Sequence, residues 1–326
     1  MQSLRIGIVG TGWFSQVHAD HIATMNDVSL QAICGSSLEK GEQMARRYGA
    51  TGYGRVVDML EAEKLDGVYI CVPPMAHGEI EKLLIDRGIP FLVEKPIATD
   101  TKLPRELWRQ IEAKSLITSV GYHFRYNKTV NQMRELLGEQ QVGMAVGQWM
   151  GSMPGVAWWR QQEGSGGQFI EQTTHIVDML RYCLGEVEEV YAMYGNRVMH
   201  EQHDYVSVPD VGTVSMRLKS GVIANISNTC VLPGGVDRTG LTFYTGEGML
   251  DWNPNRLKVV TPQVSTEYTD SANPYLLESE AFIHAIRTGD TSRIRSDYAD
   301  AFKTQVVTCA ALESATLGKP ITLHNG

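Results

Sequence analysis

A lysine at the end of a buried strand is the side chain of this sequence best placed to do chemistry. The tripeptide Glu94-Lys95-Pro96 directly follows the apolar run of residues 89–93, which predicts a strand. Open parallel sheets bind ligands at the carboxyl ends of their strands, so we expect the Lys95 ammonium group to face a ligand. Pro96 restricts the backbone of the residue before it and helps to fix the direction of that side chain. Glu94 is expected to support this loop rather than to do chemistry.

A glycine-rich turn follows the first predicted strand, residues 4–9. Gly10 permits a tight turn, and Gly12 lets the backbone approach a pyrophosphate, which would sit against the N-terminus of the next helix. Ser15 replaces the third glycine of the usual pattern, and its small side chain still fits there. Because the turn joins a strand to a helix, it predicts a dinucleotide site rather than an ordinary tight turn. The residues assigned to that site are Gly10, Thr11, Gly12, Trp13 and Phe14.

The end of the second predicted strand, residues 28–34, should select the nucleotide. An acidic side chain there would hydrogen-bond the adenosine ribose of NAD. This chain instead carries the hydroxyls of Ser36 and Ser37 and the ammonium group of Lys40, which could hold a 2′-phosphate. The missing acid also removes a repulsion that would exclude NADP. We therefore expect NADP in preference to NAD, although Glu39 could turn inward and allow both.

A double proline, Pro73-Pro74, ends the next predicted strand at residues 67–72. It makes a rigid, extended corner that can lie along a cofactor, with His77 opening the following helix. A proline in the first turn is also a common helix start, and both interpretations can hold together. The predicted cofactor-binding set is completed by Pro73, His77, Glu94 and Lys95.

Strands and helices alternate through the first third of the chain. Strands are expected at residues 4–9, 28–34, 67–72, 89–93 and 116–122, and helices at 18–25, 38–48 and 76–87. This alternation predicts an α/β fold in which residues 1–122 form a Rossmann domain, a doubly wound parallel sheet with helices on both faces.

The pattern changes in the rest of the chain. Helices are expected at residues 129–137, 168–184, 276–287 and 297–317, and longer alternating strands at 187–198, 212–218, 222–231 and 239–251. Long alternating strands favour antiparallel pairing. Residues 123–326 are therefore predicted to form an α+β domain with an open, mostly antiparallel sheet.

The composition narrows the class of protein. A chain of 326 residues with 43% hydrophobic residues can fill two cores. A formal charge of −8 argues against a nucleic acid or an anionic membrane as the main partner. No apolar stretch is long enough to span a bilayer, and no charged-then-apolar leader precedes the first strand, so we expect a cytoplasmic protein. The five cysteines are scattered, without the short spacings of zinc or redox sites.

In order and approximate spacing, these motifs resemble the Gfo/Idh/MocA family, named for glucose-fructose oxidoreductase and inositol dehydrogenase. The resemblance rests on residues 10–15, 73–77, 94–96 and 121–127 and on a glycine-preceded helix that carries His175. It covers nearly the whole chain. It implies a Rossmann domain, a second domain with an open mixed sheet, and NAD(P)-dependent oxidation or reduction of a sugar or polyol. It further implies that the second domain binds substrate and forms homodimers or homotetramers through its outer sheet face.

The same resemblance marks Lys95 as catalytic, together with an acidic residue and a histidine four residues apart. That pair reads Glu171 and His175 here, so a glutamate replaces the family's common aspartate, and Ser165 stands where the family has the first of three glycines. Residues four apart share one helix face, so the carboxylate and the imidazole should be neighbours. Asp178 extends the polar stripe, and we expect it to be structural.

The chemistry needs these residue types. Hydride transfer from a carbinol carbon to nicotinamide leaves a carbonyl only if the hydroxyl proton also departs, and an imidazole suits that transfer. His175 is the predicted base in oxidation and the acid in reduction. Lys95 could hydrogen-bond the same oxygen, stabilise its developing charge or carry the proton itself. Glu171 would orient His175 or bind substrate hydroxyls.

Four more residues complete the predicted substrate site. Trp159 and Arg160 could stack on a sugar or reach the nicotinamide, or they could pack as ordinary residues. Arg125 and Tyr126, at the crossover between the domains, could line a cleft or pack at a hinge. His200, His203 and Asp204 resemble a metal cluster only superficially, since no further ligands accompany them, and no metal is expected.

The predicted function is an NAD(P)-dependent oxidoreductase that acts on a secondary alcohol or ketone of a sugar, inositol or sugar derivative. One alternative is an NAD-dependent redox-assisted glycosidase, which would oxidise a sugar transiently and expel its glycosidic substituent. Another is a non-catalytic nucleotide-binding regulatory protein. Lys95 and His175 together argue against the latter, because a binding module needs neither.

Overall fold

The computed structural model describes residues 3–323, which divide into two compact units. The first unit contains the chain up to Ala98, Lys102–His123 and Asn273–Phe302. The second contains Thr99–Thr101, Phe124–Ala272 and the chain from Lys303 on. Part of the chain that was expected in the C-terminal domain, Asn273–Phe302, thus packs with the first unit.

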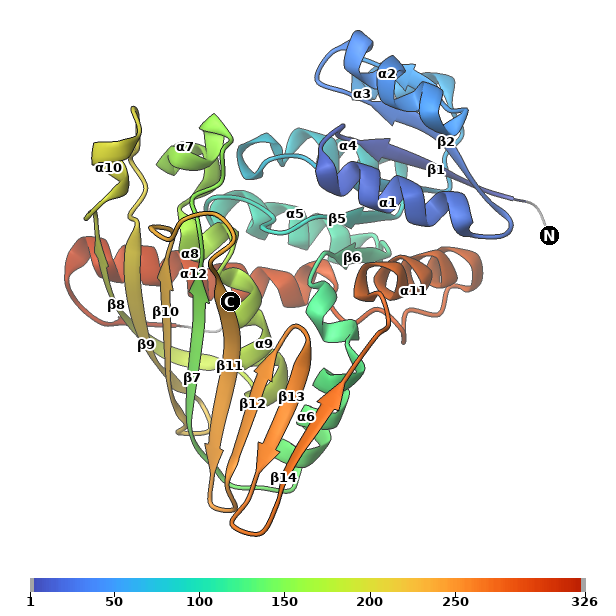
Figure 1. The fold of residues 1–326 in the computed structure, drawn as a ribbon. Coiled ribbons are helices and arrows are strands. Elements are labelled where there is room, and N and C mark those ends of the chain that lie inside the picture. The colour runs from blue at the N-terminus through green and yellow to red at the C-terminus, as the bar shows by residue number, and fades with distance from the viewer. Residues whose placement is uncertain (1–2, 324–326) are drawn as a thin grey trace. The chain divides into compact units, whose positions relative to one another are not determined.

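A six-stranded parallel sheet forms the centre of the first unit, in the strand order β3-β2-β1-β4-β5-β6 (Figure 1). The strands are β1 Leu4–Val9, β2 Val28–Cys34, β3 Thr51–Tyr53, β4 Gly67–Ile70, β5 Phe91–Val93 and β6 Thr118–Val120. The prediction of a Rossmann sheet is confirmed. The short strand β3 was not expected.

Six α-helices accompany this sheet, and two of them close one core. They are α1 Trp13–Thr24, α2 Leu38–Tyr48, α3 Val56–Ala62, α4 Glu79–Arg87, α5 Lys102–Ala113 and α11 Pro274–Thr288. Ile22 of α1 and Phe282 of α11 pack in one cluster with Ile6 and Ile8 of β1. Helix α11 is therefore part of the core of the first unit, although it lies far along the chain.

The second unit contains a nine-stranded sheet in the order β14-β13-β12-β11-β7-β10-β9-β8-β15 (Figure 1). Within the described residues, β7 and β10 form its one parallel pair, so the predicted mostly antiparallel sheet is confirmed. The strands are β7 Val142–Met150, β8 Val187–Gly195, β9 Val211–Leu218, β10 Ile223–Thr229, β11 Arg238–Thr245, β12 Met249–Asn253, β13 Arg256–Val260, β14 Ser265–Thr269 and β15 Ile321–Thr322.

Helices cover one face of this sheet and leave the other face exposed. Val214, Met216 and Leu218 alternate inward along β9, while Ser215 and Arg217 point to the outer face. The inward side chains form one core with residues of three helices. These are α6 Lys128–Gly138, α9 Thr174–Leu184 and α12 Tyr298–Leu317, of which the residues from Lys303 on belong to this unit.

Several predicted elements differ from the structure. The helix expected at 18–25 begins earlier, at Trp13. The helix expected at 76–87 begins only at Glu79, because Pro74–Ala76 forms a 3-10 turn and Gly78, with φ 117°, precedes the helix. The helix expected at 168–184 is divided into α8 Gln168–Glu171 and α9. The strand expected at 239–251 is a hairpin of β11 and β12, since a glycine-containing turn interrupts it. Strands β7, β13, β14 and β15 were not predicted.

Within residues 3–323, no helix is both long enough and apolar enough to cross a membrane.

Candidate active site

The glycine-rich turn has a geometry that only glycine satisfies at its first position. Gly10 has φ 118°, and a Cβ atom there would collide with the carbonyl oxygen of Cys71. The same Cβ would lie 2.8 Å from the Ser15 hydroxyl, which is fully buried against the turn. A Cβ at Gly12, in contrast, would meet nothing within 4 Å. Helix α1 begins at Trp13 without a side-chain cap, so its first N–H groups suit a phosphate.

The residues expected to select the nucleotide lie at the end of the neighbouring strand. Gly10 N donates to Cys34 O at 2.8 Å, which joins the ends of β1 and β2. Ser37 caps helix α2, since its hydroxyl accepts from Lys40 N at 3.3 Å. Ser36 is exposed, and Lys40 Nζ lies 3.3 Å from its hydroxyl. A cation and a hydroxyl thus stand together at this strand end.

The double-proline corner is extended at Pro73, as expected, but His77 does not open a helix. It follows the 3-10 turn and is buried, with Nδ1 2.6 Å from Glu81 Oε1. The same carboxylate accepts from Gly78 N, so Glu81 links His77 and Gly78 to the first turn of α4. The assignment of Pro73 and His77 to the cofactor site stays a prediction.

Lys95 follows strand β5 directly, and its neighbour Glu94 is held by a buried histidine. Glu94 Oε1 lies 2.8 Å from Nε2 of His18, which comes from α1. His18 is fully buried, and its Nδ1 is 3.3 Å from the hydroxyl of Ser279 in α11. Gly121 packs against the carboxylate, because a Cβ there would lie 2.5 Å from Glu94 Oε2. The loop that presents Lys95 is thus tied to α1 and α11.

His123, which interacts electrostatically with Lys95, and its stacking partner Tyr275 were not expected from the sequence. The ring of His123 stacks on Tyr275 with a centroid distance of 4.0 Å and an angle of 22°. Burial, and next the charge of Lys95, lower the pKa of His123 to about 3, so this imidazole is neutral at pH 7. Burial, followed by the charges of Glu94 and Glu278, raises the pKa of Tyr275. A neutral imidazole thus lies close enough to Lys95 to interact with its charge.

In the second unit, Glu171 and His175 lie on two successive short helices. Gln168 O accepts from both Gln172 N and Thr173 N at 2.9 Å, so the backbone widens between α8 and α9. Such wide turns inside helices are frequent at functional sites. His175 is buried and stacks on Trp149 with a centroid distance of 5.7 Å and an angle of 18°. Its imidazole is therefore held rigidly by packing.

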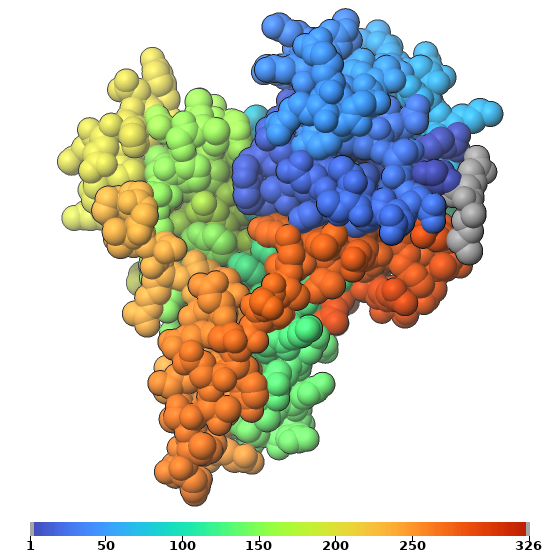
Figure 2. Space-filling view, turned by 45° about the vertical axis from the view of Figure 1, so that its right-hand side comes forward, coloured from blue at the N-terminus to red at the C-terminus, as the bar shows by residue number. Residues whose placement is uncertain are grey.

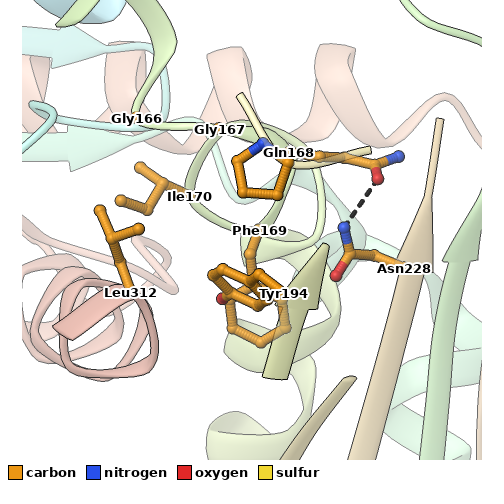
Figure 3. Close-up of a pocket in the computed structure, with 9 residues that line it drawn as sticks. Gly166, Gly167, Gln168, Phe169, Ile170, Tyr194, Asn228 and Leu312 are labelled. Carbon is orange, nitrogen blue, oxygen red and sulfur yellow. Dashed lines mark hydrogen bonds between the residues drawn. The ribbon is translucent and has the colours of Figure 1, made fainter. Parts of the chain in front are cut away.

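The glycines before α8 belong to a well-filled turn rather than to an open pocket. Gly166 and Gly167 both have positive φ, and Gln168 Oε1 accepts from Asn228 Nδ2 at 2.7 Å (Figure 3). Figure 3 shows these residues around a small gap beside Phe169. The cavity there has a volume of about 10 Å³, which is room for about one water molecule. It is too small for a sugar.

The predicted substrate residues are buried to different extents. Arg125 donates to both oxygens of Asp178, at 2.7 and 2.6 Å, and lies over the ring of Tyr182. Thr304 donates to the same carboxylate at 3.0 Å. This buried ion pair favours the packing alternative for Arg125 and gives Asp178 a structural contact.

Trp159 is 1% exposed, so its ring offers no face for stacking on a sugar. Instead its Nε1 donates to Glu171 Oε2 at 2.7 Å. Tyr126 is also buried. Arg160 is half-buried at the end of the 3-10 turn Ala157–Arg160, and its carbonyl accepts from Ser207 N at 2.9 Å.

The segment around residues 196–210, yellow in Figure 2, stands out at the surface of the second unit. It contains the short helix α10 Met199–Gln202, with His203 and Asp204 in the loop that follows. Asp210 anchors its base by accepting N–H bonds from Arg197, Val198 and Met199. Across residues 3–323, no group of three or more His, Cys, Asp or Glu side chains is arranged to hold a metal ion.

Two family models match this chain. One, described as an oxidoreductase family with an NAD-binding Rossmann fold, matches residues 4–122. The other, the GFO/IDH/MocA C-terminal domain, matches residues 130–251. The fold and the matches together show that the chain belongs to the Gfo/Idh/MocA family of oxidoreductases.

Characterised relatives are similar to this chain over nearly its whole length. The myo-inositol 2-dehydrogenase of Thermotoga maritima is 23% identical over 312 residues, covering 90% of this chain and 91% of its own. The D-glucoside 3-dehydrogenase of Escherichia coli is 26% identical, covering 98% and 97%. Among solved structures, a myo-inositol dehydrogenase from Corynebacterium glutamicum is 25% identical with a TM-score of 0.82, covering 99% of this chain and all of its own. Levoglucosan dehydrogenase in complex with NADH and L-sorbose shares the fold, with a TM-score of 0.90 at 19% identity and full coverage of both chains.

The two glycines of the turn should respond differently to the same added methyl group. We expect Gly10→Ala to lower the free energy of unfolding by about 1–3 kcal/mol, because Gly10 has positive φ and no room for a Cβ. Gly12→Ala should fold normally, since its Cβ meets nothing, but should weaken dinucleotide binding by roughly tenfold by filling the space that a pyrophosphate approaches. Chemical denaturation and NAD(H) titration measure the two effects. Equal behaviour of the two variants would contradict these roles.

Proposed function

We propose that this protein is an NAD(P)-dependent dehydrogenase that acts on a secondary alcohol or ketone of a sugar, inositol or sugar derivative. The observation that carries the proposal is the position of Lys95. It is a buried lysine at the carboxyl end of β5, in the same sheet whose first strand ends in the glycine-rich turn. The names of the relatives support the substrate class, since they are inositol and glucoside dehydrogenases.

The residues of the first unit fit a dinucleotide. The open space above Gly12 and the uncapped start of α1 would receive its pyrophosphate. The bound nicotinamide would supply the hydride acceptor or donor. Lys95 would hold the substrate oxygen and stabilise negative charge on it, next to the neutral imidazole of His123.

We assign the proton transfer to His175 and the binding of substrate hydroxyls to Glu171. His175 is held by Trp149, so its ring is oriented before substrate arrives. It would accept the hydroxyl proton in oxidation and return it in reduction. The glycosidase and regulatory alternatives are less favoured, because the named relatives are dehydrogenases. The cytoplasmic location stays a prediction from the sequence.

A turnover screen tests the proposed function. We expect at least one sugar, inositol or keto derivative to change the nicotinamide absorbance with NAD(H) or NADP(H). Lys95→Ala should then lower kcat by about 10²-fold or more, and His175→Asn should do the same, while both variants keep dinucleotide binding and a normal melting temperature. Retained turnover in Lys95→Ala, or an unchanged kcat of His175→Asn at every pH, would refute the assigned role of that residue.

We propose that the loop after β2 favours NADP. Lys40 and Ser36 stand together at its surface, where a 2′-phosphate could bind them. Lys40→Ala should therefore raise the KM for NADP(H) by roughly tenfold and leave the KM for NAD(H) almost unchanged. Lys64→Ala, at another exposed lysine of the first unit, is the matched control and should change neither KM. An equal effect of Lys40→Ala on both cofactors would remove the basis for this preference.

We also propose that the protein forms homodimers or homotetramers through the outer face of its large sheet. Met144 lies directly opposite both Ile223 and Tyr244 in neighbouring strands, so the three side chains share that face. They are 42%, 45% and 44% exposed, an apolar row across three strands. Such a patch is typical of an interface between subunits.

Light scattering after size-exclusion chromatography tests the assembly. The wild type should have two or four times the mass of the chain, and Met144→Glu should reduce that mass because a charge would be buried in the interface. Val264→Glu, at a more exposed apolar residue outside the row, should leave the mass unchanged. A monomeric wild type, or an unchanged mass for Met144→Glu, would contradict the proposal.

A further inference from the structure

Ser165 and Glu171 both form hydrogen bonds with one buried tryptophan, Trp159. Ser165 donates its hydroxyl to Trp159 O at 2.8 Å and accepts from Gly167 N at 3.0 Å. Trp159 in turn donates its indole N–H to Oε2 of Glu171 at 2.7 Å. Ser165 and Trp159 are buried, while Glu171 is partly exposed. Ser165 and Glu171 are thus connected through Trp159.

The types and lengths of these side chains suit the two hydrogen bonds. A buried indole N–H needs an acceptor, because an unpaired donor in the interior is costly. Glu171 reaches the indole with a carboxylate, which makes the hydrogen bond charge-assisted and strong. An aspartate at 171 would be one methylene shorter, and a glycine at 165 would lack the hydroxyl that holds the Trp159 backbone.

The indole bond restricts a side chain that otherwise has three rotatable bonds. Glu171 ends helix α8, just before the widened turn that leads to His175. With Oε2 held by Trp159, the plane and direction of the carboxylate are set before any substrate binds. A carboxylate has about four acceptor positions, so this bond is compatible with a further bond from a sugar hydroxyl.

We propose that Trp159 is a positioning residue that sets the substrate specificity of Glu171, by aiming its carboxylate at one hydroxyl of the bound sugar or polyol. The proposal rests on the proposed function, since it assumes that Glu171 binds substrate. It replaces the stacking role expected for Trp159 from the sequence, because the ring is buried and its N–H is the group that acts.

The kinetic test compares a substrate with its monodeoxy analogues. A site built to bond a hydroxyl discriminates strongly against the analogue that lacks it. Trp159→Phe, which keeps a ring and removes the N–H, should raise KM for the full substrate about tenfold, with a smaller change in kcat. The ratio of kcat/KM for the full substrate to that for one monodeoxy analogue should fall by a similar factor. The reason is that Trp159→Phe weakens the bond to the hydroxyl that this analogue lacks. Dissociation constants for NAD(H) should not change.

A second variant keeps the test independent of the folding of Trp159→Phe. Glu171→Asp alters no core residue and should lower the same preference, because the shorter carboxylate no longer reaches the indole. In the double variant, Trp159→Phe should add nothing to the effect of Glu171→Asp on this preference, because the shorter carboxylate has already lost the indole bond. In ¹⁵N-tryptophan spectra, the indole N–H signal lost in Trp159→Phe should move in Glu171→Asp and on addition of substrate.

Trp252→Phe is the matched control. Trp252 is also 1% exposed, and its Nε1 donates to the hydroxyl of Thr129 at 3.4 Å. Its replacement should lower the melting temperature as Trp159→Phe does but leave the preference unchanged. The proposal is overturned if Trp159→Phe behaves in the same way as Trp252→Phe, or if the two site variants are additive. A wild type with no turnover in the screen, but with the indole signal responding to Glu171→Asp, would instead overturn the proposed function.

Discussion

The buried hydrogen bond between His18 and Glu94 is the contact on which the nucleotide-binding unit depends. It joins α1, which begins at the glycine-rich turn, to the loop that presents Lys95, and Ser279 extends it to α11. A carboxylate buried to this degree needs such partners, because an uncompensated charge in the interior costs several kcal/mol. The glycine-rich turn and the proposed catalytic lysine are therefore positioned by one contact rather than by two separate local structures.

Local signals made most of the first unit predictable. Its strands end at motifs whose backbone requirements are visible in the sequence, such as the positive φ of Gly10. The central strand β7 of the other sheet was missed because its two glycines weaken the strand pattern. The structure explains one of them, since a Cβ at Gly147 would lie 2.6 Å from Ile176 of α9. The close packing of α9 thus requires a glycine in β7, and this glycine weakens the strand pattern in the sequence.

The residues proposed for the candidate site stand in sequence motifs, whereas their surroundings are set by the fold. Lys95 and His175 stand in recognisable motifs, whereas His18, His123 and Tyr275 come from segments that only the fold brings together. No spacing rule connects a histidine in α1 to a glutamate 76 residues later. For Trp159, the residue type suggested a ring that stacks on a sugar. The structure shows a buried ring whose N–H donates to Glu171.

The return of the chain to the first unit at Asn273–Phe302 affects how the molecule can be made. Phe282 and Ile283 belong to the same core as Ile6 and Ile8, so a nascent chain that has reached only residue 122 lacks part of its own interior. Ser279, the partner of His18, is also still missing at that stage. Although its motifs are all N-terminal, the nucleotide-binding unit cannot complete its core until synthesis has passed Phe302. A fragment that ends at residue 122 is therefore not a module that can be transplanted.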